Sequence, residues 1–237
     1  MDQTAYQKFA TDTLGIKFKN IELLITAFTH RSYLNEHKKT VSEHNERLEF
    51  LGDAVLELVV TEYLYANFTE PEGILTNWRS ALVRTESIGA AATRQEFEPL
   101  LRLSRGEKRG TPRARAQILA NSFEAVIGAI YLDQGYETAK NFITNSLIST
   151  FEEILHSGSW MDPKSHLQEL VQSQEGFTPV YKIVEETGPD HDKTFTVGVF
   201  VDGTLRGQGV GPSKQHGQQK AAEAALISYK ATLKKAS

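Results

Sequence analysis

The chain has 237 residues, enough for one large or two small domains, and 40% of them are hydrophobic. It contains no cysteine, which excludes disulfides, thiolate metal sites and cysteine nucleophiles, and its net charge of −4 does not by itself indicate a nucleic-acid partner. No signal peptide or run of about 18 apolar residues is visible, so we expect a cytoplasmic protein without a membrane partner.

Apolar spacing predicts that residues 1–156 fold into helices alone. Glycine and proline residues mark the breaks between the helices, and no alternating pattern in this part indicates a strand. The expected helices cover residues 2–13, 20–30, 44–66, 74–95, 115–132 and 137–155.

The third predicted helix places three carboxylates on one side. At about 100° per residue, Glu46, Glu49 and Asp53 lie within roughly 60° of arc. Leu56 and Val60 continue the same stripe, so we expect a buried helix whose carboxylates need a partner. A solvated acidic edge is the alternative, although like charges at this spacing cost a helix about 0.2–0.5 kcal/mol. A divalent cation between the carboxylates would offset that repulsion.

The fifth predicted helix carries one acid, Glu124, in an otherwise apolar stretch. Asn121 stands three residues before it on the same side. We expect both side chains to face Glu49 and Asp53 across two packed helices, where hard oxygen ligands would surround one Mg²⁺. A lone buried glutamate paired with an arginine is the alternative. The seven histidines are scattered and suggest no other chemistry.

Basic residues are concentrated between Arg102 and Arg115, where only Glu107 opposes them. A local basic surface on a mildly acidic protein suits a polyanion bound in a defined place. A solvated loop is the alternative interpretation of this cluster, which includes Arg113.

The pattern changes after a short linker over residues 157–161. Asp162 followed by Pro163 is typical of a helix start. The order helix, three strands, helix over residues 162–233 predicts a small α+β domain. The expected elements are a helix over 164–174, strands over 179–186, 194–201 and 204–210 with a hairpin turn at Asp202-Gly203, and a helix over 214–233.

These patterns together resemble bacterial ribonuclease III across nearly the whole chain. Its signature helix appears as Asn45-Glu-Arg-Leu-Glu-Phe-Leu-Gly-Asp53, and its second acidic motif as Leu119-Ala-Asn-Ser-Phe-Glu-Ala-Val-Ile-Gly128. The resemblance implies an all-α endonuclease domain over residues 1–156, followed by an α+β double-stranded-RNA-binding domain over residues 162–233. It also implies a homodimer, paired through the catalytic domain, that hydrolyses double-stranded RNA to 5′-phosphate and 3′-hydroxyl ends in ribosomal and messenger RNA processing.

The resemblance further implies which residues form the site. Asp53 and Glu124 are the expected catalytic residues, and Glu46 and Glu72 are expected accessory acids. The expected ligands of Mg²⁺, for which Mn²⁺ can substitute, are Glu49, Asp53, Asn121 and Glu124. Asn121 stands where the family pattern has aspartate, and it offers an amide oxygen without a charge. A cleavage-deficient double-stranded-RNA-binding protein is therefore the alternative function, and a metal-free helical scaffold with an RNA-binding module is a third.

Three regions of the second domain resemble the RNA contacts of its family: the first helix, the loop after the first strand and the start of the last helix. Gln215 and Gln218 stand where basic residues are usual, which predicts weaker binding by shape. The RNA-binding residues that the resemblance implies, together with one from the basic cluster, are Gln168, Glu169, His191, Ser213, Lys214, Lys220 and Arg113.

Overall fold

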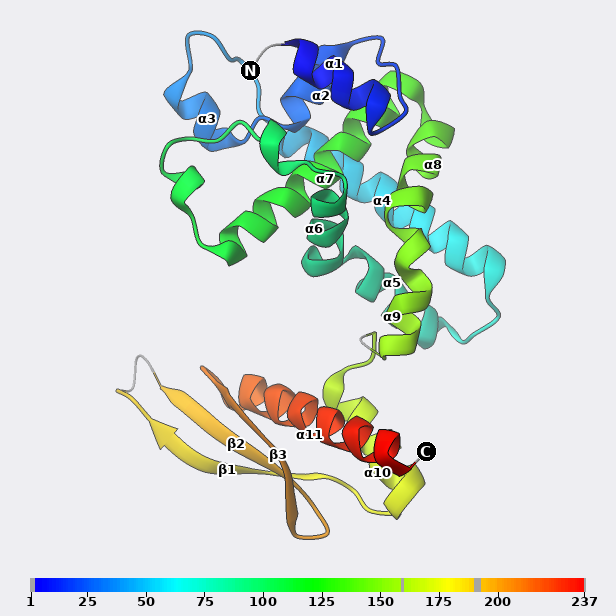
Figure 1. Ribbon diagram of the computed structural model, residues 1–237, viewed down its shortest axis with the longest axis vertical. Coiled ribbons are helices and arrows are strands. Elements are labelled where there is room, and N and C mark those ends of the chain that lie inside the picture. Colours follow the sequence, from blue (N-terminus) through cyan, green and yellow to red (C-terminus); the bar gives the residue numbers. More distant parts are fainter. Residues whose placement is uncertain (1–2, 159, 190–192, 237) are drawn as a thin grey trace. The chain divides into compact units, whose positions relative to one another are not determined.

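The computed structural model describes residues 3–158, 160–189 and 193–236, with side chains described as far as Tyr229. Its contacts divide the chain into two compact units, Met1–His156 and Ser157–Ser237. Figure 1 shows the helices of the first unit and the sheet and helices of the second. No helix in the described part of the chain is long and apolar enough to cross a membrane.

The first unit is built from helices, which confirms the predicted all-α fold (Figure 1). Three short 3-10 turns and one isolated bridge between Thr29 and Arg102 are the other regular features of its described residues. The helices are α1 (Gln3–Asp12), α2 (Ile21–Ala27), α3 (Arg31–Glu36), α4 (Glu46–Asn67), α5 (Glu72–Val83), α6 (Thr85–Arg94), α7 (Pro112–Gln134), α8 (Tyr136–Ser146) and α9 (Phe151–Ser157).

Two predicted helices are divided in the structure. The helix expected over residues 74–95 is broken at Arg84, whose backbone is extended (φ −70°, ψ 152°), so α5 and α6 run in different directions. Across this break the Ser87 hydroxyl donates to the carbonyl oxygen of Ala81 at 2.7 Å. The helix expected over residues 137–155 is likewise divided into α8 and α9. Neither break has a glycine or proline to mark it, so the sequence pattern did not predict them.

Helices α4 and α7 form the most extensive helix pair and cross in the middle of the unit (Figure 1). Leu56 and Val60 of α4 are fully buried, as is Phe123 of α7. The prediction that α4 is a buried helix is nevertheless wrong for its outer face, where Phe50 is 82% exposed and Tyr65 is 83% exposed. An apolar residue shows that a position can be buried, but only the packing decides whether something covers it.

The second unit confirms the predicted order of helix, three strands and helix. Its elements are α10 (Pro163–Glu175), β1 (Val180–Thr187), β2 (Thr194–Val201), β3 (Thr204–Gly211) and α11 (Lys214–Ala236). The strands form one antiparallel sheet in the order β1-β2-β3. The side chain of Asp162 accepts hydrogen bonds from the backbone N–H groups of Lys164 and Ser165, which caps α10. Positive φ angles at Asp202 and Gly203 allow the tight hairpin turn.

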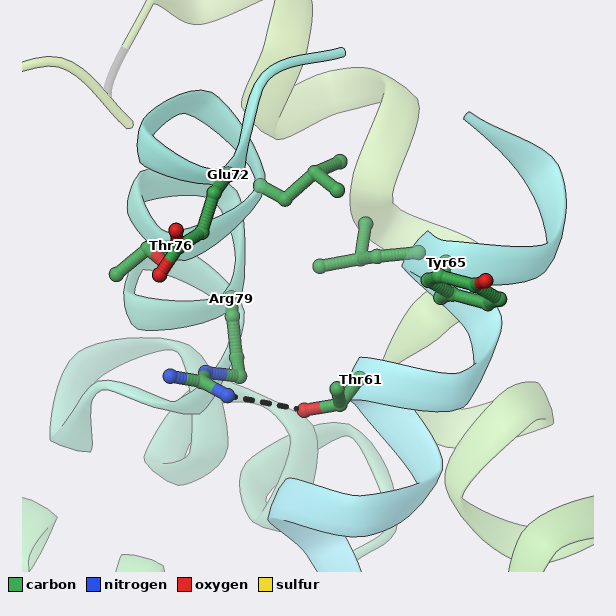
Figure 2. Close-up of a pocket in the computed structure, with 7 residues that line it drawn as sticks. Thr61, Tyr65, Glu72, Thr76 and Arg79 are labelled. Carbon is green, nitrogen blue, oxygen red and sulfur yellow. Dashed lines mark hydrogen bonds between the residues drawn. The ribbon is translucent and has the colours of Figure 1, made fainter. Parts of the chain in front are cut away.

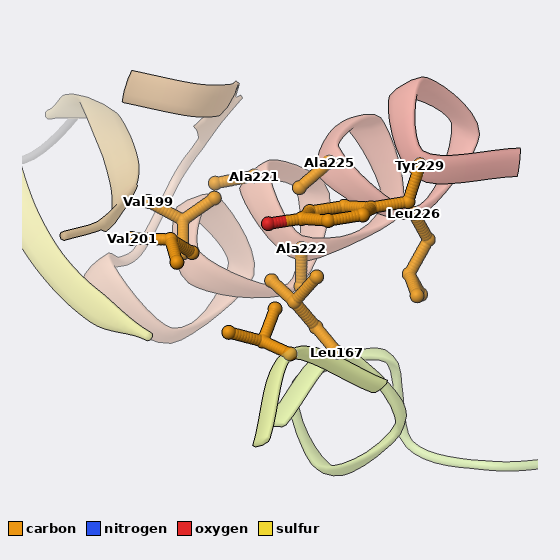
Figure 3. Packing of buried hydrophobic residues seen from close by; sticks show 9 residues of the cluster. Leu167, Val199, Val201, Ala221, Ala222, Ala225, Leu226 and Tyr229 are labelled. Carbon is orange, nitrogen blue, oxygen red and sulfur yellow. The ribbon is translucent and has the colours of Figure 1, made fainter. Parts of the chain in front are cut away.

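Helix α11 packs along the sheet, and α10 packs against α11. Figure 3 shows the resulting core, in which valines from β2 and a leucine from α10 meet a row of small residues on α11. The small alanine side chains let α11 pack closely against α10 and the sheet. The core residues are Leu167, Val171, Val199, Val201, Ala221, Ala222, Ala225, Leu226 and Tyr229.

Candidate functional site

The backbones of α4 and α7 touch at two glycines. A Cβ atom on Gly52 would lie 1.8 Å from the carbonyl oxygen of Glu124, and one on Gly128 would lie 2.3 Å from that of Leu48. Any side chain at either glycine would therefore push the two helices apart. This contact sets Glu124 beside the turn of α4 that carries the predicted acids.

Three carboxylates share this crossing: Glu49, Asp53 and Glu124. Burial, together with the charges of Asp53 and Glu49, raises the pKa of Glu124 from 4.5 to about 7. Burial and the nearby charges of Glu46 and Asp53 raise the pKa of Glu49. None of the three carboxylates forms an ion pair with any residue that the structure describes. The crossing therefore holds negative charge that no cationic side chain among the described residues pairs with.

Asn121 lies at the same crossing, and its side chain is hydrogen-bonded to Gln117 on the same helix. Its Oδ1 accepts a hydrogen bond from Nε2 of Gln117 at 2.7 Å. The nearby Asn121 side chain opposes the increase in the pKa of Glu49. Gln117 was not among the predicted site residues, and its only sequence signal is its place one helical turn before Asn121.

The donors at this crossing fit a hard divalent cation. Carboxylate oxygens are the ligands that Mg²⁺ and Mn²⁺ prefer, and like charges held near one another favour a bound cation. Within the described ranges, no three His, Cys, Asp or Glu side chains lie close enough together to coordinate one metal ion as they stand. The cation would therefore have to draw these carboxylates toward a common point.

The two accessory acids lie in different surroundings. Glu46 is exposed at the start of α4, with Oε1 3.6 Å from Nη1 of Arg31. Glu72 begins α5 and lines a pocket of about 390 Å³ between α5 and the second half of α4 (Figure 2). Of the residues of α4 that line this pocket, Thr61 is the nearest to Asp53 along the helix. At a rise of 1.5 Å per residue, the two positions are about 12 Å apart. Within a single chain, Glu72 therefore lies away from the carboxylates of the α4–α7 crossing.

Among the predicted RNA-binding residues of the second unit, Gln168 and Glu169 are exposed on α10. Ser213 Oγ accepts the N–H of His216 at 3.2 Å at the start of α11. Lys214 is exposed there, whereas Lys220 donates to Glu223 at 2.7 Å and is partly neutralised. His191 lies outside the described residues.

Gln215 and Gln218 differ in a way that the sequence did not indicate. Gln215 is exposed, whereas Gln218 Oε1 accepts a hydrogen bond from Nζ of Lys164 at 2.7 Å. The same ammonium group lies 5.1 Å from the centre of the Tyr181 ring. Gln218 therefore holds a lysine of α10 in place and does not simply leave a phosphate contact vacant.

The basic residues between Arg102 and Arg115 fall into two groups, those with a partner in the first unit and those exposed to solvent. Arg102 lies 4.5 Å from the centre of the Tyr33 ring, and Arg115 pairs with Glu98 at 3.4 Å. Both are thus held by the fold of the first unit. The exposed basic residues are Arg105, Lys108, Arg109 and Arg113.

Comparisons with known proteins agree with the division of the chain into two units. The family described as Ribonuclease-III-like matches residues 20–151, and the double-stranded RNA binding motif matches residues 163–229. Ribonuclease 3 of Streptococcus gordonii is 45% identical over 221 residues, covering 91% of this chain and 93% of that protein. Ribonuclease 3 of Anoxybacillus flavithermus is 46% identical over 231 residues, covering 96% and 97%.

A solved nuclease domain of ribonuclease III from Campylobacter jejuni, described for flexibility in a region involved in its dimer formation, is also similar. Its TM-score is 0.55 at 38% identity, and the match covers 61% of this chain and 98% of that one. A second solved nuclease domain from the same organism has a TM-score of 0.51 at 36% identity, covering 62% of this chain and 93% of its own.

Proposed function

Because the chain belongs to the ribonuclease III family and is an endoribonuclease of double-stranded RNA, we propose that Glu49, Asp53 and Glu124 hold the divalent cation with which it cuts. The observation that carries this assignment is the α4–α7 crossing, where three carboxylates meet without a cationic partner among the described residues. Mg²⁺ is the expected cation, and Mn²⁺ accepts the same oxygen ligands.

In this mechanism the protein brings carboxylates from two helices to one place. Glu49 and Asp53 are one helical turn apart on α4, and Glu124 approaches from α7. Since its pKa is about 7, Glu124 is partly protonated near neutral pH, and it would lose this proton if a cation were held beside it. A bound divalent cation supplies Lewis-acid stabilisation of the charge that develops on the phosphodiester. We propose products with 5′-phosphate and 3′-hydroxyl ends.

The second unit binds double-stranded RNA, because residues 163–229 match the double-stranded RNA binding motif. We propose that Gln168 and Glu169 of α10 reach one minor groove and that Ser213 and Lys214 meet phosphates at the start of α11. Exposed Arg113 would add a phosphate contact in the catalytic domain, over residues 1–156. His191 and the partly neutralised Lys220 complete the proposed set, and ribosomal and messenger RNA in the cytoplasm are the proposed substrates.

We also propose a homodimer that pairs through the catalytic domain. The outer face of α4 leaves Phe50, Leu58 and Tyr65 exposed, and the pocket at Glu72 borders that face. Uncovered apolar surface of this kind is typical of protein interfaces. Since one chain keeps Glu72 away from its own crossing, pairing is the simplest way for this acid to reach a cleavage site.

Cleavage of a fully paired RNA duplex by the purified protein tests the catalytic assignment. We expect cutting in millimolar Mg²⁺, none in EDTA, and a loss of at least a hundredfold in Glu124→Gln. Glu137→Gln makes the same chemical change at an exposed residue of α8 and should leave cleavage intact. A wild-type protein that binds the duplex without cutting it, but cuts after Asn121→Asp, would instead support the cleavage-deficient alternative.

A further inference from the structure

The side chain of Lys164 is held in place where α10 packs against α11. Its Nζ donates a hydrogen bond to Oε1 of Gln218 at 2.7 Å and lies 5.1 Å from the centre of the Tyr181 ring. Fixing a flexible lysine side chain costs conformational entropy, which a hydrogen bond and a cation–π contact offset. The ammonium group therefore occupies one place on the domain instead of moving freely in solvent.

No carboxylate among the described residues forms an ion pair with Lys164. Asp162, the acid nearest to it in the sequence, instead accepts the backbone N–H groups of Lys164 and Ser165. Gln218 is a neutral partner and takes one of the three N–H groups of the ammonium. Because Lys164 is only half-buried, its charge and its other two N–H groups are left for an acceptor outside the protein.

The other cationic side chains of the second unit have different surroundings. Three of them, as far as side chains are described, form ion pairs with glutamates: Lys193, Arg206 and Lys220. Lys182 lies 5.4 Å from the centre of the Phe200 ring. Because neighbouring strand residues point to opposite faces, Lys182 is on the open face of the sheet and Tyr181 is on the face that packs against the helices. Lys164 and Lys214 are thus the cations without a carboxylate partner on the helix side, within the described part of the domain.

The contact between Lys164 and Gln218 joins the two helices at the proposed RNA contacts. Gln168 follows Lys164 by one turn on α10, and Gln218 follows Lys214 by one turn on α11. Residues four apart lie on the same side of a helix. The ammonium group of Lys164 is therefore held between the proposed minor-groove contact and the proposed phosphate contact, where a bound duplex presents its backbone.

We propose that Lys164 binds a phosphate of the RNA duplex, and that Gln218 is a positioning residue that fixes its ammonium group for this contact. The inference rests on the proposed function, in which Gln168 and Lys214 touch the RNA. Gln218 brings no charge of its own. It contributes to phosphate binding through a lysine of the other helix, which a mobile side chain at the same position would do less well.

The salt dependence of duplex binding by the full-length protein tests the role of Lys164. Fluorescence anisotropy of a labelled RNA duplex is measured in EDTA between about 50 and 200 mM salt. We expect Lys164→Gln to weaken binding about tenfold and to flatten the salt dependence by about one unit of slope. Lys182→Gln is the matched control, because it removes the same charge from the open face of the sheet. Its slope should stay close to that of the wild type.

Gln218→Met tests the positioning role, because it keeps the length of the side chain and removes the acceptor. We expect it to weaken binding about threefold in the wild type, with the slope retained, and to have no effect in a protein that already carries Lys164→Gln. Equal losses in both backgrounds would show that Gln218 acts independently of Lys164 and would overturn its positioning role. Unchanged affinity in Gln218→Met alone would overturn it as well.

Lys214→Gln separates this inference from the proposed function. A slope that flattens in Lys214→Gln but not in Lys164→Gln overturns the inference and leaves the proposed function standing. Slopes unchanged in both variants reject the proposed RNA-binding face together with the inference. Equal flattening in Lys164→Gln and Lys182→Gln would show an effect of net charge alone and would also overturn the inference.

Nuclear magnetic resonance of the lysine ammonium groups in the wild type gives a second measurement. We expect the ¹⁵Nζ signal of Lys164 to shift when the RNA duplex is added, and that of Lys182 to change little. A Lys164 signal that the duplex leaves unchanged would contradict the proposed phosphate contact, even if a variant failed to fold.

Discussion

Gly52 of α4 and Gly128 of α7 are in backbone contact: a Cβ atom on Gly52 would lie 2.9 Å from the backbone nitrogen of Gly128. The nearest atoms on both sides of this contact are backbone atoms, which cannot rotate away as a side chain can. The distance between the two helices, and with it the distance between their carboxylates, therefore depends on the absence of side chains at two positions.

We expect Gly52→Ala and Gly128→Ala each to lower the free energy of unfolding by about 1–3 kcal/mol or more, since a methyl group must separate two packed backbones. Urea denaturation measures the change. Gly73→Ala in α5 is the control, because no atom lies within 4 Å of the position that its Cβ atom would take; it should change stability by less than about 1 kcal/mol. Equal stability of Gly52→Ala and Gly73→Ala would show that the helices are not in contact at this point.

The raised pKa of Glu124 predicts how stability depends on pH in EDTA. The native carboxyl, with a pKa of about 7, keeps a proton that the unfolded chain releases near 4.5. The stability that Glu124 contributes is thus fully present below pH 4.5 and is lost as the pH rises through 7. Glu124→Gln cannot ionise, so at pH 8 it should exceed the wild type by on the order of 1–2 kcal/mol, with allowance for solvent screening at a partly exposed group. Urea denaturation at pH 4 and pH 8 measures this difference, and a difference that does not grow with pH contradicts the prediction.

A bound cation should reverse this loss at pH 8. A cation that binds only the folded protein adds about 2.7 kcal/mol of stability at a concentration of about 100 times its Kd. We expect Mg²⁺ or Mn²⁺ to raise the unfolding temperature of the wild type, and Asp53→Asn to remove most of that increase. Asp12→Asn makes the same change at an exposed position of α1 and should keep the full increase. An increase that persists in Asp53→Asn would place the cation elsewhere.

The two glutamines at the start of α11 should respond differently to substitution by lysine. Gln215 is exposed, so Gln215→Lys adds a cation that can meet a phosphate and should steepen the salt dependence of duplex binding by about one unit of slope. Gln218→Lys would place a second ammonium group next to that of Lys164 and remove the oxygen to which Lys164 donates. We therefore expect lower stability, and an increase of less than one unit in the slope of the salt dependence. Binding measured between about 50 and 200 mM salt distinguishes them. Equal slopes for the two variants would show that the Lys164 contact has no effect on RNA binding.

The exposed face of α4 predicts the oligomeric state. Phe50→Glu places a charge on a residue that is 82% exposed in one chain, and burial of that charge in a dimer would be costly. We expect a largely monomeric protein by light scattering, with unchanged helix content. Phe177→Glu is the control, because this phenylalanine is exposed in the other unit and should leave the dimer intact. A monomeric wild type would reject the proposed homodimer.

Much of the fold is visible in the sequence because helices and strands repeat over a few neighbouring residues. The alternation of Thr194–Val201 predicts β2 with its bounds, and the glutamate spacing on α4 predicts which residues share a side. The breaks between α5 and α6 and between α8 and α9 were missed, because they are fixed by packing and by contacts such as that between Ser87 and Ala81. Local periodicity carries no signal for them.

By itself, the sequence determined the two kinds of domain and placed acidic residues on two apolar helices. Only the tertiary structure decided that Gly52 and Gly128 let those helices touch, that Glu72 lies away from the crossing, and that Asn121 turns its oxygen toward Gln117. The physical reason is one of range. Backbone preferences and amphipathic periods act between near neighbours along the chain, whereas the partner of a side chain depends on how closely two distant backbones can approach.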